Sequence, residues 1–315
     1  METGNFMTHL SCLALLFGAQ TTALDSLQAE YAAATKPTFD SGKLATINQK
    51  VLDLIDSGDV STPIQFRIAA GLITDFRFRF EVSRVRHELA LCALANDATT
   101  DSEELAKTWD GFLISTGRSQ RIGSFDYPGE QFKVDSAPRS IVAVLKNPVR
   151  ARLAAATKTP SQEIEKIVTA DQAARAADWS KLTQAQLEAI QQGDAQRKAR
   201  VLQLLKSGKV VTFQDFERSS LVMQHGQGWN DYVIAHELAM CSLLLGSNKS
   251  AWLCAATYDR LMGSAGYRQR FGTQYSSDGN GPFKHDPVDT RGINDAMRKA
   301  LSCPTLKEAS ERKFD

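Results

Sequence analysis

The sequence HELALC at residues 87–92 recurs as HELAMC at residues 236–241, and this repeated stretch decides the fold. The two copies are 149 residues apart. The same offset pairs further residues downstream: Thr108 with Thr257, Asp110 with Asp259, Gly117 with Gly266, Gln120 with Gln269, Arg121 with Arg270, and Gly123 with Gly272. A register kept over such a span predicts an internal duplication.

The repeat extends in both directions from this stretch. Upstream the offset becomes 150 residues, and it pairs Val51-Leu52 with Val201-Leu202, Ser57-Gly58 with Ser207-Gly208, Thr62 with Thr212, and Phe66 with Phe216. Downstream, Leu145 and Pro148 match Leu301 and Pro304 if the second copy has a seven-residue insertion. We therefore predict two homologous units: a first unit at residues 24–150, which is the diverged copy, and a second unit at residues 151–315.

The hydrophobic pattern of the second unit predicts helices. Residues 231–245 carry apolar side chains at helical spacing on two adjoining faces, which indicates a deeply buried helix. Residues 246–249 (GSNK) form a turn, and Ser250 can cap a second helix that ends near Gly263. Together they predict an antiparallel helical hairpin.

The remaining segments are consistent with an all-α fold. Residues 275–289 are rich in Gly, Ser, Asp and Pro and are expected to form a loop, and a last helix is expected at residues 293–301. No stretch alternates between polar and apolar residues as a strand does. We therefore predict an all-α fold in which two homologous units of antiparallel helical hairpins pack together.

Composition and charge exclude several classes of protein. The 315 residues are 43% hydrophobic and 23% charged, which fits a globular chain of one large domain or two ordinary ones. The 37 Lys and Arg residues balance 36 Asp and Glu residues, so no basic surface for nucleic acid is predicted. No stretch is long and apolar enough for a transmembrane segment.

The N-terminus contains the one strongly apolar stretch, LSCLALLFGA at residues 10–19. Ten residues are too few to cross a bilayer, but they fit the centre of a secretory signal peptide, with Thr21-Thr22-Ala23 as its cleavage site. Residues 1–8 contain no Lys or Arg, so an ordinary N-terminal helix is the alternative. We predict a cleaved signal at residues 1–23 and a secreted or periplasmic protein, which without cleavage would be cytoplasmic.

One end of the second-unit hairpin gathers polar residues. His236 and Asp259 lie equally far from the turn, so an antiparallel pair places them level, and we predict a hydrogen bond between them. Both have copies in the first unit, His87 and Asp110, which favours an architectural role. A carboxylate-oriented histidine can also act as a general base.

Other polar residues at this end occur only in the second unit. At the matching positions the first unit has different side chains: Gly111 for Arg260, Ser124 for Thr273, and Phe125 for Gln274. We therefore predict the ligand site in the second unit. Its ligand-binding residues are predicted to be Gln224, His225, Arg260, Gln269, Thr273 and Gln274.

Metal motifs are incomplete in this chain. The sequence HELAM at residues 236–240 resembles the start of the zinc-protease helix motif, which needs a second histidine where this chain has Met240. Alternatively, the loop before this helix could fold toward it and place His225, Asp231 and His236 around a metal ion. We predict no metal and no cofactor.

Two cysteines lie level across the predicted hairpin. Cys241 and Cys254 are equally far from the turn, so an exported protein could join them by a disulfide. Leu105 stands in place of the second cysteine in the first unit, which indicates that the hairpin does not need the bond.

A set of short motifs runs through the second unit: Asp171-Gln172-x-x-Arg175, Gln224-His225-Gly226, Asp231-Tyr232, Ala235-His236-Glu237-Leu238-Ala239, Asp259-Arg260, and Gly266-x-x-Gln269-x-Phe271-Gly272-Thr273-Gln274. In combination, over residues 165–303, they resemble a bacterial domain-of-unknown-function family. The resemblance implies an all-helical domain with these polar residues grouped, and it implies no activity. The spacing of small residues also resembles tetratricopeptide hairpins, but the period of about 34 residues is absent.

Two functions stay open at this point. The first is a helical binding or interaction protein that holds a small polar ligand or a peptide in the second unit. The second is an enzyme of the hydrolase or transferase type, with His225 or His236 as the base and Arg260 as the anion binder. The catalytic candidates are therefore His225, His236 and Asp259. The enzyme hypothesis requires these groups to line one open pocket.

Overall fold

The computed structural model describes residues 22–36, 40–74, 77–96, 102–177, 181–277 and 283–313. Nearly all secondary structure in these ranges is helical, which confirms the predicted all-α class. The signal peptide predicted at residues 1–23 lies outside the described residues up to residue 21, and its last two residues, Thr22 and Ala23, begin α2. Within the described residues, no helix has the length and apolarity needed to cross a membrane.

The helices follow one another in the same order in both predicted units. In the first segment the elements are α2 (Thr22–Thr35), α3 (Ser41–Asp56), α4 (Pro63–Leu72), α5 (Phe80–Asn96), α6 (Ser102–Ser115), the 3-10 helix η1 (Glu130–Phe132), α7 (Arg139–Lys146) and α8 (Pro148–Ala155). In the second they are α9 (Gln162–Arg175), α10 (Gln184–Lys206), α11 (Phe213–Met223), α12 (Trp229–Leu244), α13 (Ser250–Ser264), α14 (Asp295–Ala300) and α15 (Leu306–Ser310). The expected hairpin is the pair α12 and α13.

The segment expected to be a loop contains a short antiparallel ladder. Strand β1 (Tyr275–Ser276) pairs with β2 (Lys284–His285), with Tyr275 opposite His285. With only two residues in each strand, this ladder leaves the all-α class unchanged.

The same local signals begin and end matched helices. Thr62 and Thr212 each form a capping box at the start of α4 and α11, in which the third helical residue reaches back to the cap. Gly58 and Gly208 follow α3 and α10 with positive φ angles of 86° and 69°, a conformation that glycine adopts without strain. The sequence register therefore coincides with matched helix boundaries.

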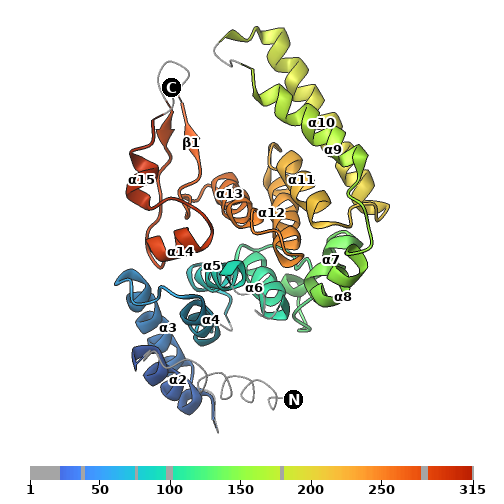
Figure 1. The fold of residues 1–315 in the computed structure, drawn as a ribbon. Coiled ribbons are helices and arrows are strands. Elements are labelled where there is room, and N and C mark those ends of the chain that lie inside the picture. The colour runs from blue at the N-terminus through green and yellow to red at the C-terminus, as the bar shows by residue number, and fades with distance from the viewer. Residues whose placement is uncertain are drawn as a thin grey trace.

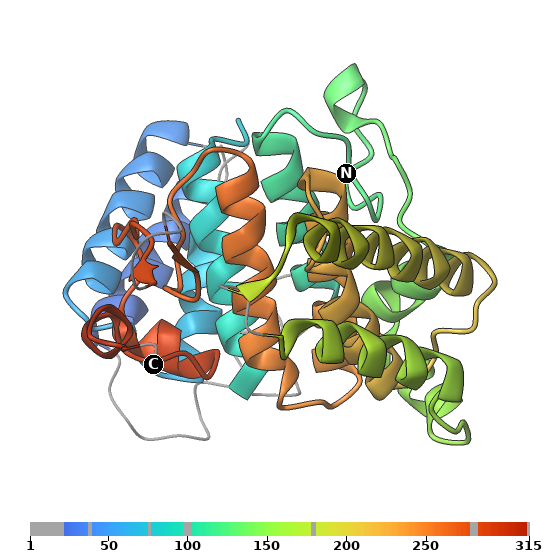
Figure 2. The ribbon, with the colours of Figure 1, turned by 90° about the horizontal axis from the view of Figure 1, so that it is seen from above.

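Helices α5 and α12 form the centre of the molecule. Helix α5 packs between α4 and α6, and α12 packs between α11 and α13. Both are buried on nearly every face, which explains why their apolar pattern covers more than one stripe. Figure 1 shows α2 and α3 below this centre and the α9–α10 arm rising above it. Figure 2 shows the same arm lying across α11 and α12 from above.

Segments at the end of each predicted unit pack against the other unit. Helix α7 contacts α12 and α10, and α14 contacts α5. The side-chain amide of Asn294 donates to the carbonyl oxygens of Ile55 (2.9 Å) and Val60 (3.0 Å). The backbone amide of Gly292 donates to the Asp56 carboxylate (2.7 Å). One continuous apolar core runs through both segments. The two predicted units are therefore tied together along much of their length.

Candidate functional site

The repeated histidines meet at the centre of the molecule. The Nε2 atoms of His87 and His236 lie 3.2 Å apart. On the other side of each ring, Nδ1 contacts a threonine hydroxyl, Thr108 at 3.2 Å and Thr257 at 3.0 Å. Both rings are completely buried. The four side chains form one chain of hydrogen-bonding groups across the boundary between the predicted units.

Two reciprocal ion pairs flank the histidines. Arg270 donates from Nε and Nη2 to Glu88 at 2.7 and 2.9 Å, and Arg121 donates from Nε and Nη2 to Glu237 at 2.9 and 3.2 Å. Such bidentate pairs are geometrically specific. Each pair joins a glutamate of one predicted unit to an arginine of the other. We call these six residues the seam: His87, Glu88, Arg121, His236, Glu237 and Arg270.

Burial controls protonation in the seam. Burial lowers the pKa of His236 to about 3, although the Cys254 carbonyl opposes this shift. Burial, together with the neighbouring His236, also lowers the pKa of His87 far below its usual value. Both rings are therefore neutral at neutral pH. Since both nitrogens of His236 have partners and the ring has no exposed surface, the structure gives it no access to a substrate.

The predicted hydrogen bond between His236 and Asp259 is wrong. Asp259 instead accepts from the backbone amides of Arg270 (2.7 Å), Phe271 (2.9 Å) and Thr273 (3.0 Å), and from the Thr273 hydroxyl (2.7 Å). The reason is that the tight turn after α13 exposes several amides that need a buried acceptor. Burial raises the pKa of Asp259, while these hydrogen bonds act in the opposite direction.

The first unit has the same arrangement around Asp110. Its carboxylate accepts from the amides of Arg121 (2.7 Å), Ile122 (3.0 Å) and Ser124 (2.9 Å). An acceptor found at matched turns in both segments is explained by the turn itself. Asp259 therefore has a loop-holding role that leaves it no free oxygen for catalysis.

Three of the predicted ligand-binding residues hold the turn after α13. Gln269 donates to the carbonyl oxygens of Gln274 (3.1 Å) and Asp286 (2.7 Å), and it accepts from the Gln274 amide (2.8 Å). Thr273 donates to Asp259, and the Gln274 side chain donates to Thr273 (2.8 Å) and the Ala256 carbonyl (3.3 Å). These contacts satisfy the loop and leave few groups for a ligand.

The other three predicted residues lie in a different environment. Gln224 and His225 follow α11, and Arg260 lies near the end of α13. His225 pairs with Asp171 of α9, and Arg260 lies within range of the charge on Arg175 of α9. With the polar side chains of α9 and α10, these three residues are therefore treated as one group. We call this group the second-unit cluster: Asp171, Arg175, Asp194, Arg197, Gln224, His225 and Arg260.

Ion pairs connect the α9 and α10 members of the cluster. Asp194 binds Arg175 at 2.8 Å and Arg197 at 2.5 Å. Asp171, which is fully buried, lies 2.9 Å from Nδ1 of His225 and 3.5 Å from Nε of Arg197. Burial raises the pKa of Asp171, but His225 and Arg175 outweigh burial and lower it below the usual range. Asp171 is therefore a buried carboxylate that lies next to the His225 ring.

Arg260 has no hydrogen bond or ion pair within the part of the chain that the structure describes. Burial lowers its pKa, the charge of Arg175 lowers it further, and Tyr232 and Asp259 act in the opposite direction. Its Nε atom is buried without a partner. A partly buried guanidinium without a partner is costly, because nothing replaces the water it has lost.

Buried polar atoms without hydrogen bonds concentrate in this cluster. Among the described residues there are thirteen such side-chain atoms, and six belong to Asp171, Arg175, Arg197, Gln224, His225 and Arg260. The atoms on Asp171, Arg197 and His225 lie in the ion pairs above, which leaves Nη1 of Arg175, Oε1 of Gln224 and Nε of Arg260. Gln224 is only 6% exposed. Native proteins leave few buried polar groups unsatisfied, so a concentration of them indicates a site.

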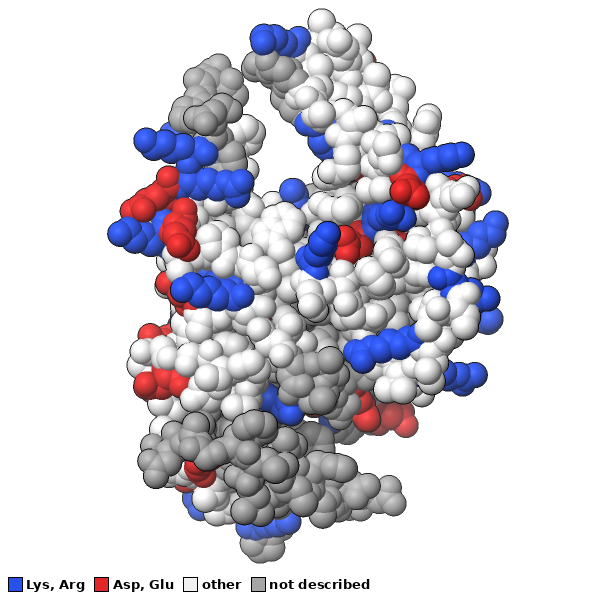
Figure 3. Space-filling model, in the orientation of Figure 1, with Lys and Arg blue, Asp and Glu red and all other residues white. Residues whose placement is uncertain are grey.

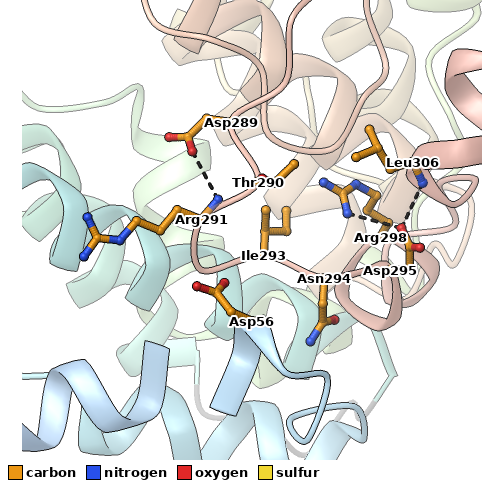
Figure 4. A pocket seen from close by; sticks show the side chains of 9 residues that line it. All are labelled: Asp56, Asp289, Thr290, Arg291, Ile293, Asn294, Asp295, Arg298 and Leu306. Atoms are coloured by element: carbon orange, nitrogen blue, oxygen red, sulfur yellow. Dashed lines mark hydrogen bonds and ion pairs between the residues drawn. The ribbon is translucent and has the colours of Figure 1, made fainter. Parts of the chain in front are cut away.

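The surface is hollowed next to the elements that carry the cluster. Figure 3 shows a notch in the surface beside the α9–α10 arm. Two other hollows lie elsewhere, one between α3 and residues 289–306, and one between the end of α6 and the start of α12. In the first of these, drawn in Figure 4, the polar groups bind one another: Asp295 accepts from Arg298 (3.2 Å) and the Leu306 amide (2.8 Å).

The matching position in the first segment is filled by aromatic rings. Gly111 stands where the second unit has Arg260, and a Cβ atom placed there would lie 3.8 Å from both Phe78 and Phe125. The Phe78 ring packs edge-on against Phe125 and Phe132, with centroid distances of 5.0 and 5.7 Å. The polar site therefore has no counterpart at this position.

The alternatives that involved metals and cysteines receive no support from the geometry. His225 lies against Asp171, Asp231 against Lys198 at 2.6 Å, and His236 in the seam, so these three do not share one centre. No group of three or more His, Cys, Asp or Glu residues in the described ranges is placed to hold a metal ion. Cys241 and Cys254 are buried and free, so the possible disulfide between them is not formed.

Comparisons with protein-family models, curated proteins and solved structures find no match for this chain.

Proposed function

We propose that this chain is a helical binding protein whose second unit holds a small polar ligand or a peptide at the second-unit cluster. The observation that supports this is that three buried polar atoms without partners lie on Arg175, Gln224 and Arg260, of which Gln224 adjoins His225 in the chain and Arg260 lies within range of the Arg175 charge. Each such atom costs about 1–3 kcal/mol when buried without a partner, and a ligand would supply the missing hydrogen bonds.

The duplication supports the same proposal. We propose that the two units descend from one helical ancestor, because matched residues make matched contacts in the seam and in the turns held by Asp110 and Asp259. The cluster departs from this equivalence, since Gly111 and its aromatic neighbours replace the Arg260 environment. A polar site kept in one copy alone is better explained by a ligand than by the needs of the scaffold.

An enzyme of the hydrolase or transferase type is the second candidate. It is favoured by one contact, the 2.9 Å pairing of Asp171 with His225, which resembles the carboxylate that orients a catalytic histidine. In this version His225 alone is the base, and Arg260 holds an anionic group. His236 and Asp259 have structural partners and are not part of this candidate site.

Thermal unfolding with a panel of small polar metabolites and short peptides tests the binding function. We expect at least one compound to raise the melting temperature of the parent protein and of Arg291→Met, an exposed arginine in the hollow of Figure 4. The rise should be lost in His225→Ala and in Arg260→Met. If the parent converts one of these compounds to a product and His225→Ala does not, the enzyme is favoured. If a compound raises the melting temperature of all four proteins equally, a site at the cluster is contradicted.

We also propose that the chain is exported after removal of residues 1–23, on the strength of the apolar stretch at residues 10–19. The mass of the mature protein purified from a bacterial host decides this, because an intact Met1 contradicts cleavage.

A further inference from the structure

The charges of the second-unit cluster do not balance. It contains three guanidinium groups, on Arg175, Arg197 and Arg260, and two carboxylates, on Asp171 and Asp194. Both carboxylates are already engaged by Arg175 and Arg197, and Asp171 also holds His225. Arg260 is therefore the one cation of the cluster that lacks a carboxylate.

The position of Arg260 is unfavourable for an isolated protein. The guanidinium is partly removed from water and feels the positive charge of Arg175. An anion beside Arg260 would relieve both the lost hydration and the repulsion. The donor left open at Nε of Arg260 is also the atom that a carboxylate or phosphate group uses in a bidentate pair.

Gln224 adds a second requirement. Its Oε1 atom is a buried acceptor without a partner, in a side chain that is 6% exposed. A carbonyl oxygen cannot bind an anion, so this atom needs an N–H or O–H donor. A ligand that satisfies both residues carries an oxyanion and a hydrogen-bond donor in the same small molecule.

We propose that the second-unit cluster binds a small oxyanion, a carboxylate or a phosphate group, on Arg260, and that Gln224 accepts a hydrogen bond from a donor on the same ligand. This inference rests on the proposed binding function and names the class of ligand. It also sets the stoichiometry at one site per chain, because Gly111, Phe78 and Phe125 leave the first unit no guanidinium at the matching position.

Four simple probes separate these requirements. Lactate carries a carboxylate and a hydroxyl, propionate the carboxylate alone, and lactamide the hydroxyl with a neutral amide, while glycerol phosphate replaces the carboxylate by a phosphate. Each is titrated calorimetrically into the full chain at constant ionic strength, since salts alter stability without a specific site. We expect saturable binding of lactate or glycerol phosphate at one site per chain, with propionate weaker and lactamide weakest.

Three variants assign the binding to the cluster. Arg260→Met should weaken the preferred oxyanion by about tenfold or more, as expected for loss of a charge-assisted hydrogen bond. Gln224→Met should reduce the preference for lactate over propionate and leave propionate itself unchanged. Arg291→Met, an exposed arginine outside the cluster, should bind as the parent does.

The outcomes separate this inference from the proposed function. If lactamide binds as well as lactate, and both are lost in Arg260→Met, the site takes a polar ligand and the oxyanion inference is wrong. If lactate and glycerol phosphate fail to bind at millimolar concentrations, the inference is also overturned, whereas the metabolite and peptide panel still decides the binding function. Preference between lactate and glycerol phosphate identifies which oxyanion the site takes.

Discussion

The seam and the second-unit cluster are built from the same kinds of side chain, and they differ in how completely those side chains are satisfied. In the seam each arginine meets one glutamate through two parallel hydrogen bonds, and each histidine has a partner on both nitrogens. In the cluster Asp171 and Asp194 form ion pairs with two arginines and a histidine, and Arg260 has no partner among the described residues.

This difference separates architecture from a site within one chain. Buried charges that are completely paired position the elements around them, because removing one partner strands the other. Buried charges that are incompletely paired are costly in the isolated protein, so their presence is best explained by a function. The seam should therefore respond to mutation through stability, and the cluster through binding.

Loss of an arginine from the seam should have the largest effect. In Arg270→Met the fully buried Glu88 keeps no ion-pair partner, and we expect the free energy of unfolding to fall by about 3–5 kcal/mol. Urea denaturation of the parent and the variant measures this change. Arg291→Met, in which the arginine is exposed, should change it by less than about 0.5 kcal/mol.

The double variant Glu88→Met with Arg270→Met sharpens this test. It removes both charges, so it should recover much of the stability that the single change loses. If Arg270→Met and Arg291→Met were equally stable, the seam would not hold the two units together as described.

Acid should weaken the seam through its two histidines. His87 and His236 have pKa values below those of the unfolded chain, so the unfolded state binds more protons between pH 6.5 and the lowered pKa. Stability contributed by the neutral rings is therefore present above about pH 6.5 and is lost as the pH falls. The loss amounts to about 1.4 kcal/mol per pH unit for each histidine that titrates.

Measurement between pH 6.5 and 5 isolates this contribution, because ordinary carboxylates stay ionised there in the unfolded chain. The raised pKa of Glu237 acts in the opposite direction, since the folded state then takes up its proton first. The contribution of Glu237 is shared by the parent and His236→Gln, so it cancels when the two are compared. The free energy of unfolding of His236→Gln should depend less steeply on pH than that of the parent.

Much of the fold could be predicted from the sequence, because repeated residues report on repeated surroundings. The repeat of His87 at His236 set the register of the duplication, and residues paired by that register, such as Thr62 and Thr212, begin helices in both segments. The sequence could not show that the two histidines touch, since a repeat gives equivalence and not proximity. For the same reason, the sequence could not show that Glu88 of the first unit pairs with Arg270 of the second.

The candidate site was predicted in part. The comparison of copies selected Gln224, His225 and Arg260, which belong to the cluster, but it also selected Thr273 and Gln274, which hold a turn together with Gln269, a residue that the first unit matches with Gln120. Level positions on a hairpin made His236 and Asp259 look like partners, although side-chain direction on each helix sends them elsewhere. Asp171 and Arg175 were visible as a motif, whereas Asp194 and Arg197 joined the site through the packing of α10 on α9, which no local pattern reports.

Loss of the arginine at position 260 should change stability little, and this result bears most directly on the cluster. Arg260→Met replaces a partly buried, unpaired guanidinium by an apolar side chain of similar length, so it removes a desolvation cost and keeps the packing. We expect the free energy of unfolding to stay the same or to rise by up to about 1 kcal/mol, while ligand binding is lost, since functional sites commonly trade stability for activity. Urea denaturation of Arg260→Met beside Arg270→Met measures both arginines under one condition. A loss of several kcal/mol in Arg260→Met would mean that this guanidinium is paired and structural, and the distinction between seam and cluster would then fail.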